Sequence, residues 1–136
     1  MKIKVYLDSD TIIAALIKPD GATAELLKSS KITKHLSNTS QTEILRVSRR
    51  MALNVDQTQK IIKSCQLTTV TVKEITQVSD YVYDLDDQHI LASAKKSQSQ
   101  FLVTYNLKHY NISRIHRELG IIVLIPAKLL QHVRGL

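Results

Sequence analysis

The stretch IKVYLDSDTIIAALI, residues 3–17, joins the pattern of a strand to the pattern of a helix. Its residues Ile3, Val5 and Leu7 recur with a period of two, which is typical of a β-strand. Small polar side chains then follow Asp8 and precede an apolar run, as they do where a helix begins. The sequence therefore predicts a strand that ends at Asp8 and a helix that starts directly after it.

The same alternation of strands and helices continues along the chain. Further strands are expected at residues 31–36, 67–72, 101–103 and 121–125, and helices at residues 22–29 and 56–65, after the polar cluster 37–40 and from Asp87 onward. The helix after residue 40 should bury Ile44, Val47 and Met51. The last two strands are almost continuously apolar, which is typical of strands covered on both faces. Because strands that alternate with helices form a parallel sheet, we predict a single α/β domain over residues 1–136, in which α-helices flank a central parallel β-sheet.

Charge is the most informative part of the composition. The 136 residues include 19 Lys and Arg against 12 Asp and Glu, a formal net charge of +7, which is expected of a protein that contacts phosphate backbones. Candidates for that contact are spread over the chain: Lys34, Arg46, Arg49, Arg50, Lys95, Lys96 and Lys108. Five Tyr, one Phe and no Trp leave too few rings for the stacking platforms of single-strand-binding sheets.

Neither a membrane segment nor a disulfide framework is expected. The apolar runs, such as residues 121–125, are far shorter than the roughly 18 residues that span a bilayer. The single cysteine, Cys65, cannot form an internal disulfide. We therefore expect a soluble protein of the reducing cytoplasm, with no membrane partner.

Acidic and amide side chains fall where strands of the predicted sheet end. Asp8 ends the first strand, and Asp87 opens the helix before the fourth. Asn106 follows Thr104, the residue at which the fourth strand ends, by two positions. Glu43 lies in the first turn of its predicted helix. Because ligands collect at the carboxyl ends of parallel strands, we expect these side chains to share one edge of the sheet.

Three carboxylates on one edge would repel one another at neutral pH unless a cation or a proton offset their charge. Oxygen ligands alone favour a hard ion, Mg²⁺ or Mn²⁺, completed by a phosphate of the substrate. The sequence thus predicts a metal site formed by Asp8, Glu43 and Asp87. An acidic metal site within a basic chain is typical of a metal-dependent nuclease, because basic residues hold the nucleic-acid backbone while the acids hold the ion.

Each of these acids also has a simpler interpretation. Asp8 and Asp87 could serve their helices alone, the first as a cap and the second through the helix dipole. Glu43 could be a surface acid paired with Arg46. His109, near the same edge, could contact phosphate or assist proton transfer. These alternatives stay open at the level of sequence.

Four segments, taken in order, resemble the PIN-domain family: VYLDSDTIIAALI (residues 5–17), QTEILRV (41–47), DDQHILASA (86–94) and FLVTYNLKHY (101–110). The segment GIIVLIPAKLL (120–130) is similar to the closing strand and helix of that family. The resemblance implies a parallel sheet between helices and a Mg²⁺- or Mn²⁺-dependent endoribonuclease that cleaves RNA. It also implies the toxin of a type II toxin–antitoxin pair, VapC-like, that forms a homodimer and is blocked by an antitoxin whose basic side chain enters the acidic pocket.

The resemblance also assigns candidate catalytic residues one by one. Asp8, Glu43 and Asp87 match the acids of the family, and they are the three expected metal ligands. Thr104 matches the threonine that ends the fourth strand of the family. Asn106 completes the candidate catalytic set, because it occupies a place where family members often have Asp.

The chain departs from the family pattern at its fourth acidic position. Family members often have Asp at one of the two places held here by Asn106 and His109, and more often Asn at the place of Asp10. Three clear carboxylates remain, so a single ion completed by substrate phosphate is expected. The gap leaves open a second function, a PIN-like module that binds RNA or a protein partner with weakened or lost cleavage.

A third possibility is a phosphatase, because Asp8 and Asp10 resemble the strand-end Asp-x-Asp of haloacid-dehalogenase-type enzymes. That family places Thr two residues after its second Asp, where this chain has Ile12. A later lysine and a Gly-Asp pair at the same edge are not evident either. The pattern therefore favours the nuclease over the phosphatase.

Overall fold

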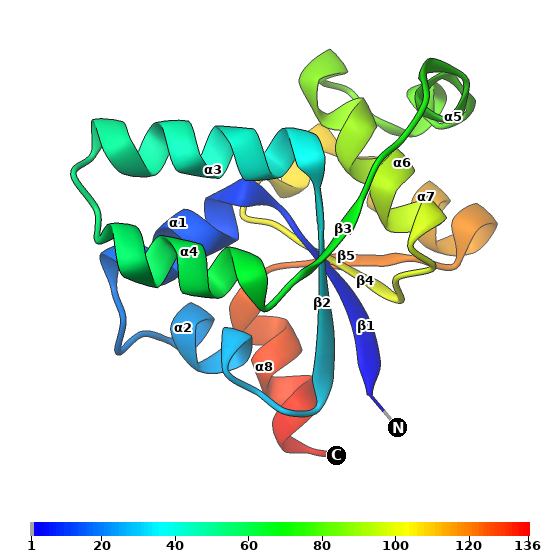
Figure 1. Cartoon of the computed structure of the whole chain (residues 1–136). Coiled ribbons are helices and arrows are strands. Elements are labelled where there is room, and N and C mark those ends of the chain that lie inside the picture. The colour runs from blue at the N-terminus through cyan, green and yellow to red at the C-terminus, as the bar shows by residue number, and fades with distance from the viewer. Residues whose placement is uncertain (1) are drawn as a thin grey trace.

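The computed structural model describes residues 2–136. Within that range five strands form one parallel sheet in the order β3-β2-β1-β4-β5 (Figure 1). The strands are β1 (Ile3–Leu7), β2 (Ile32–Ser37), β3 (Gln66–Thr68), β4 (Phe101–Val103) and β5 (Ile122–Leu124). The predicted α/β class, with a central parallel sheet flanked by helices, is confirmed.

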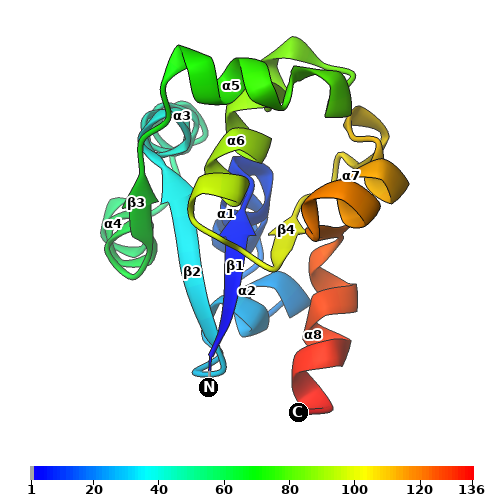
Figure 2. The ribbon, with the colours of Figure 1, turned by 90° about the vertical axis from the view of Figure 1, so that its right-hand side faces the viewer.

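Helices cover both faces of the sheet (Figures 1 and 2). On one face lie α1 (Ser9–Ile17), α2 (Ala22–Leu27), α3 (Asn38–Arg50), α4 (Val55–Lys63) and α8 (Pro126–Arg134). On the other face lie α5 (Val72–Gln77), α6 (Gln88–Lys96) and α7 (Ile112–Leu119). Each layer encloses its own apolar cluster. None of the helices within residues 2–136 combines the length and the apolar character needed to cross a bilayer.

Residues Val5–Leu7 of β1 and all of β4 are apolar because both of their faces are covered, whereas Lys4 of β1 is exposed. Val5 and Leu7 pack in the cluster beneath α1 to α4 and α8, whereas Tyr6 packs in the cluster beneath α6 and α7. Leu102 of β4 belongs to the same cluster as Tyr6. Successive residues of a strand point to opposite faces, so such a strand needs an apolar residue at every position. The edge strand β5 departs from this expectation, because its residue Ile122 is 38% exposed.

The region 67–72 differs from the predicted strand. β3 ends at Thr68, and Val72 opens the helix α5. The Thr71 hydroxyl accepts a hydrogen bond from the Glu74 N–H (3.2 Å), while the Glu74 carboxylate accepts one from the Thr71 N–H (2.9 Å). This reciprocal capping box starts a helix in spite of the β-branched residues around it. The strand predicted through Val72 is therefore wrong.

The helix α3 buries a different set of residues from the predicted one. Ile44 is fully buried, but Met51 is 44% exposed and lies just beyond the last helical residue. The buried residues of α3 are Ser40, Ile44 and Ser48. Their spacing of four keeps them on one face of the helix, and the helix ends before Met51 can extend that face.

Tyr6 ties the central strand to the neighbouring strand and to α3. Its side chain is fully buried, its oxygen accepts a hydrogen bond from the Ser37 N–H (3.1 Å), and it lies 3.3 Å from Ser40 Oγ. The Ser37 hydroxyl in turn caps α3 by accepting a hydrogen bond from the Ser40 N–H (2.9 Å). These contacts fix the start of α3, the helix that carries Glu43, against β1.

Replacing Tyr6 with Phe should therefore destabilise the fold. Tyr6→Phe removes the acceptor and leaves the buried Ser37 N–H without this partner, which costs about 1–3 kcal/mol. Urea unfolding should show a free energy of unfolding lowered by that amount. Tyr83→Phe is the matched control, because the Tyr83 side chain is 69% exposed, and it should change stability by less than about 0.5 kcal/mol. Equal effects of the two substitutions would contradict this role of Tyr6.

Candidate active site

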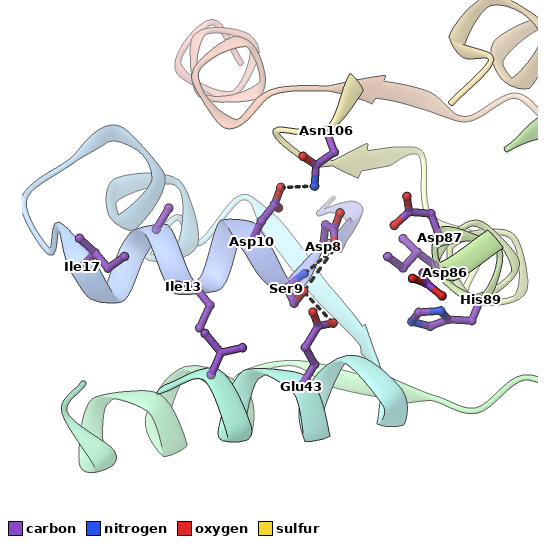
Figure 3. A pocket seen from close by; sticks show the side chains of 13 residues that line it. Asp8, Ser9, Asp10, Ile13, Ile17, Glu43, Asp86, Asp87, His89 and Asn106 are labelled. Carbon is purple, nitrogen blue, oxygen red and sulfur yellow. Dashed lines mark hydrogen bonds between the residues drawn. The ribbon is translucent and has the colours of Figure 1, made fainter. Parts of the chain in front are cut away.

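A pocket of about 400 Å³ opens at the carboxyl ends of the central strands (Figure 3). β1 lies between β2 and β4, so the chain leaves it toward opposite edges of the sheet, and in parallel sheets ligands bind at such a switch point. The polar residues that line the pocket are Asp8, Ser9, Asp10, Glu43, Asp86, Asp87, His89 and Asn106. The three expected metal ligands and Asn106 therefore line one pocket. Within residues 2–136, however, the ligand atoms of Asp8, Glu43 and Asp87 do not all lie within 4.8 Å of one another.

Asp8 follows β1 directly, and both of its carboxylate oxygens accept hydrogen bonds. Oδ1 accepts one from the Ser9 N–H at 2.7 Å, which caps α1. Oδ2 accepts one from the Thr104 hydroxyl at 2.8 Å. Only 3% of Asp8 is exposed. Asp8 is therefore a helix cap and a pocket carboxylate at the same time, so its two interpretations from the sequence are compatible.

Thr104 joins the ends of β1 and β4. It is fully buried, its hydroxyl donates to the Asp8 carboxylate, and the same oxygen accepts a hydrogen bond from the Asn106 N–H at 3.0 Å. A side chain without exposed surface does not touch a substrate. We therefore interpret Thr104 as a residue that positions Asp8 and Asn106.

Glu43 reaches the pocket from α3. The helix begins at Asn38, so Glu43 lies in its second turn rather than in the first. Its Oε2 accepts a hydrogen bond from the Ser9 hydroxyl at 3.1 Å. Among residues 2–136 no ion pair joins Glu43 to Arg46. The contact with Ser9 links Glu43 to the helix that Asp8 caps.

Asp87 stands at the end of a short 3₁₀ helix, directly before α6. Its carboxylate does not cap α6; instead, Oδ2 lies 2.5 Å from His109 Nδ1. Two backbone contacts hold the segments together, an antiparallel bridge between Val82 and Tyr110 and a hydrogen bond of 2.7 Å from the Tyr83 N–H to the His109 carbonyl. The fold therefore places His109 against a pocket acid.

A further carboxylate lies next to this pair. Asp84, Asp87 and His109 each offer one potential metal-ligating atom within 4.8 Å of the others. Asp84 also accepts a hydrogen bond from the Asp86 N–H at 3.0 Å, and the Asp86 side chain lines the pocket. The corner around Asp87 thus combines carboxylate oxygens with an imidazole nitrogen.

Asp10 lines the pocket although it was not among the expected metal ligands, because the sequence related it to the phosphatase-like Asp-x-Asp pattern. It lies in the first turn of α1 and lines the pocket. Its Oδ2 accepts hydrogen bonds from the Tyr105 N–H at 3.0 Å and from the Asn106 side-chain amide at 3.2 Å. The available signal was its separation of two residues from Asp8 at a strand end, which brings both acids to the same edge.

Burial governs the protonation of these acids. Burial, followed by the nearby charge of Asp10, raises the pKa of Asp8 from 3.8 to about 7, against the opposing effect of the Thr104 hydrogen bond. Burial also raises the pKa of Asp10 and the pKa of Asp87. Both burial and neighbouring like charges disfavour the charged form of a carboxyl group. The pocket therefore favours either protons or a bound cation.

The side chains present fit a hard divalent cation. Asp8, Glu43 and Asp87 offer carboxylate oxygens, which Mg²⁺ and Mn²⁺ prefer. In addition, Asp10 Oδ1 is buried and has no hydrogen-bond partner among the described residues. A buried polar oxygen without a partner is costly unless a ligand supplies one.

The chain belongs to the PIN-domain family. The family model described as a PIN domain matches residues 4–108, a range that contains all the expected site residues. No curated protein shows significant sequence similarity to the chain.

Solved structures with the same fold come from toxins and their complexes. A toxin–antitoxin complex from Klebsiella pneumoniae matches with a TM-score of 0.63 at 16% identity, over 87% of this chain and 95% of that chain. VapBC2 from Rickettsia felis, bound to a DNA fragment from their promoter, matches with a TM-score of 0.59 at 16% identity, over 89% and 97%. VapC20 from Mycobacterium tuberculosis, a toxin that cleaves the sarcin-ricin loop, matches with a TM-score of 0.53 at 17% identity, over 72% and 86%. At these identities the likeness concerns the fold alone.

The raised pKa of Asp8 predicts a pH-dependent stability. The folded protein holds this proton more tightly than the unfolded chain does, so its metal-free form loses stability as the pH rises from about 4 to about 7. Asp8→Asn keeps a good helix cap and removes this loss. In EDTA, the melting temperature of the variant minus that of the wild type should therefore be larger at pH 8 than at pH 5.

A charge-matched control is Asp56→Asn, at an exposed residue of α4. It should change the melting temperature by the same small amount at both pH values. A lower melting temperature for Asp8→Asn at pH 8 than for the wild type would contradict the prediction.

Proposed function

We propose that the protein is a Mg²⁺- or Mn²⁺-dependent endoribonuclease that cleaves RNA phosphodiester bonds, and that it is the toxin of a type II toxin–antitoxin pair. One observation carries this proposal: the carboxylates of Asp8, Glu43 and Asp87 reach one pocket from three separate segments at the switch point of the sheet. The whole chain has a net charge of +7 even with the acids of this pocket included, and such a charge suits a polyanionic substrate. The proposed site of action is the cytoplasm, where RNA is available.

The chain's own residues have distinct tasks in this proposal. Asp8, Glu43 and Asp87 would hold the cation, and Thr104 keeps the Asp8 carboxylate in place through its hydrogen bond. When bound, a Mg²⁺ or Mn²⁺ ion lowers the pKa of a bound water and offsets charge at the phosphate. Asn106 lines the pocket with an amide group whose second N–H can donate to a phosphate oxygen.

Exposed basic residues of α3 would hold the RNA backbone. Arg46, Arg49 and Arg50 are exposed on α3, the helix that carries Glu43. Lys34, by contrast, donates two hydrogen bonds within the protein. The arginines of α3 are therefore better candidates for phosphate contacts than Lys34.

Purified protein should cleave RNA in the presence of Mg²⁺ or Mn²⁺ and not in EDTA. Asp8→Asn, Glu43→Gln and Asp87→Asn should each slow cleavage by about 10- to 100-fold or more, because each removes a carboxylate from the cation. Electrophoresis of an end-labelled RNA after timed incubation measures the rate. Asp56→Asn, which makes the same change of charge on the exposed face of α4, should cleave at the wild-type rate.

The alternative functions give different results in the same assays. A protein that binds RNA but cuts none with either ion would be the binding module that the uncharged Asn106 suggests. A phosphatase would hydrolyse a small phosphomonoester, would lose that activity in Asp8→Asn, and would keep it in Glu43→Gln.

The pocket also suits the proposed antitoxin. Ile13 and Ile17 of α1 and Val47 of α3 line it beside the acids (Figure 3). A peptide with apolar side chains and one basic side chain would match this lining. Its apolar side chains would be buried against the apolar residues, and its basic side chain would pair with the acids. The similar solved structures include toxin–antitoxin complexes, which supports a partner of this kind.

Toxin activity predicts growth arrest when the chain is expressed alone. Asp87→Asn should relieve the arrest, because the variant lacks a proposed metal ligand, and colony counts after induction measure the effect. Growth unaffected by the wild-type chain at matched expression would contradict the toxin assignment.

For the proposed homodimer, sedimentation equilibrium should give twice the 15.4 kDa of one chain, and the mass of one chain would contradict it.

A further inference from the structure

The two oxygens of the Asp10 carboxylate have unequal surroundings. Oδ2 accepts hydrogen bonds from the Tyr105 N–H (3.0 Å) and from Asn106 Nδ2 (3.2 Å), and it lies 3.4 Å from the Thr104 hydroxyl, whose proton is donated to Asp8. Oδ1 is buried and accepts none from the described residues. Two N–H donors thus hold one oxygen in place, while the other is a buried atom without a hydrogen-bond partner among the described residues.

A purely structural role explains only half of this arrangement. The contacts of Oδ2 join α1 to the segment after β4, and a neutral amide at position 10 could accept the same hydrogen bonds. The contacts of Oδ2 do not explain why the chain has a second carboxylate oxygen here, Oδ1, that is buried without a donor. Because Asp10 lines the pocket of Asp8, Glu43 and Asp87, a cation in that pocket would supply the missing partner.

We infer that Asp10 is a fourth carboxylate of the pocket, which ligates the divalent cation through Oδ1, and that Asn106 is neutral because the contact between the two side chains admits one charge. This inference rests on the proposed metal-dependent function. The resulting carboxylate set is Asp8, Asp10, Glu43 and Asp87.

The contact between Asp10 and Asn106 explains the departure noted in the sequence. Asn106 Nδ2 donates to Asp10 Oδ2 at 3.2 Å (Figure 3). If both residues were acids, two negative oxygens would face each other there and repel. An acid on α1 and an amide after β4 form a hydrogen bond instead. Compared with the family pattern, the negative charge is therefore at Asp10 instead of at position 106, and the pocket contains the same number of carboxylates.

Exchanging the two residues tests this inference. Calorimetric titration with MnCl₂, without RNA, is carried out on the wild type, Asp10→Asn, the exchange variant Asp10→Asn/Asn106→Asp, and the control Asp56→Asn. Asp10→Asn should weaken Mn²⁺ binding by about tenfold or more, as the loss of a group at a metal site does. The exchange variant returns one charge to the contact and should bind Mn²⁺ within about threefold of the wild type. The control should bind like the wild type.

Two results would overturn the inference: unchanged Mn²⁺ affinity in Asp10→Asn, or an exchange variant that binds no better than Asp10→Asn. A wild type that binds no Mn²⁺ would overturn it as well. If circular dichroism shows that Asp10→Asn is unfolded, the exchange variant alone decides, with wild-type affinity in favour and weakened affinity against. RNA cleavage is scored separately, so a wild type that binds Mn²⁺ through Asp10 but cuts no RNA would reject the nuclease and leave this inference standing.

Discussion

The buried Asp8 carboxylate accepts two hydrogen bonds, and the positions of several other site residues depend on them. One comes from the Ser9 N–H and starts α1, and the other comes from Thr104 at the end of β4. Beside them, the Asp8 N–H donates to the Val103 carbonyl at 2.9 Å. Ser9 then contacts Glu43, and Thr104 accepts the Asn106 N–H. The pocket is therefore positioned from a single strand end.

This assembly works against stability in the metal-free protein. Burial raises the pKa of Asp8, Asp10 and Asp87 because each is more costly to ionise in the pocket than in water. Apolar clusters on both faces of the sheet offset that cost. A bound cation would remove much of it, because ligands that bind only the folded state stabilise that state. Folding and the proposed metal binding would therefore be coupled through the same carboxylates.

The sequence predicted the sheet and three of the pocket acids because strand ends can be recognised from local patterns. Asp8 follows an alternating strand and Asp87 opens a helix, so both positions follow from periodicity. Asp10 was harder to recognise, because its role depends on contacts with Tyr105 and Asn106, which are 95 and 96 residues away in the chain. Local propensity alone does not contain such contacts.

The errors in secondary structure have the same kind of cause. The β-branched residues up to Val72 favoured a strand, but the capping box of Thr71 and Glu74 starts α5. That signal is local and could have been read from the spacing of the two residues. The exposure of Met51 could not, because it depends on where α3 ends against the rest of the protein.

The distribution of charge gives a physical reason why the proposed reaction would require a cation. The acids of the pocket come from separate segments, so their negative charge is concentrated only when the chain folds. Phosphate is attracted to a chain of net charge +7 but is repelled from a pocket lined by ionised carboxylates. A divalent ion held by these carboxylates would offset their charge, so that a phosphate could bind in the acidic pocket as well as on the basic surface. The same ion that would activate the attacking water would therefore also decide where along the protein the RNA backbone is held.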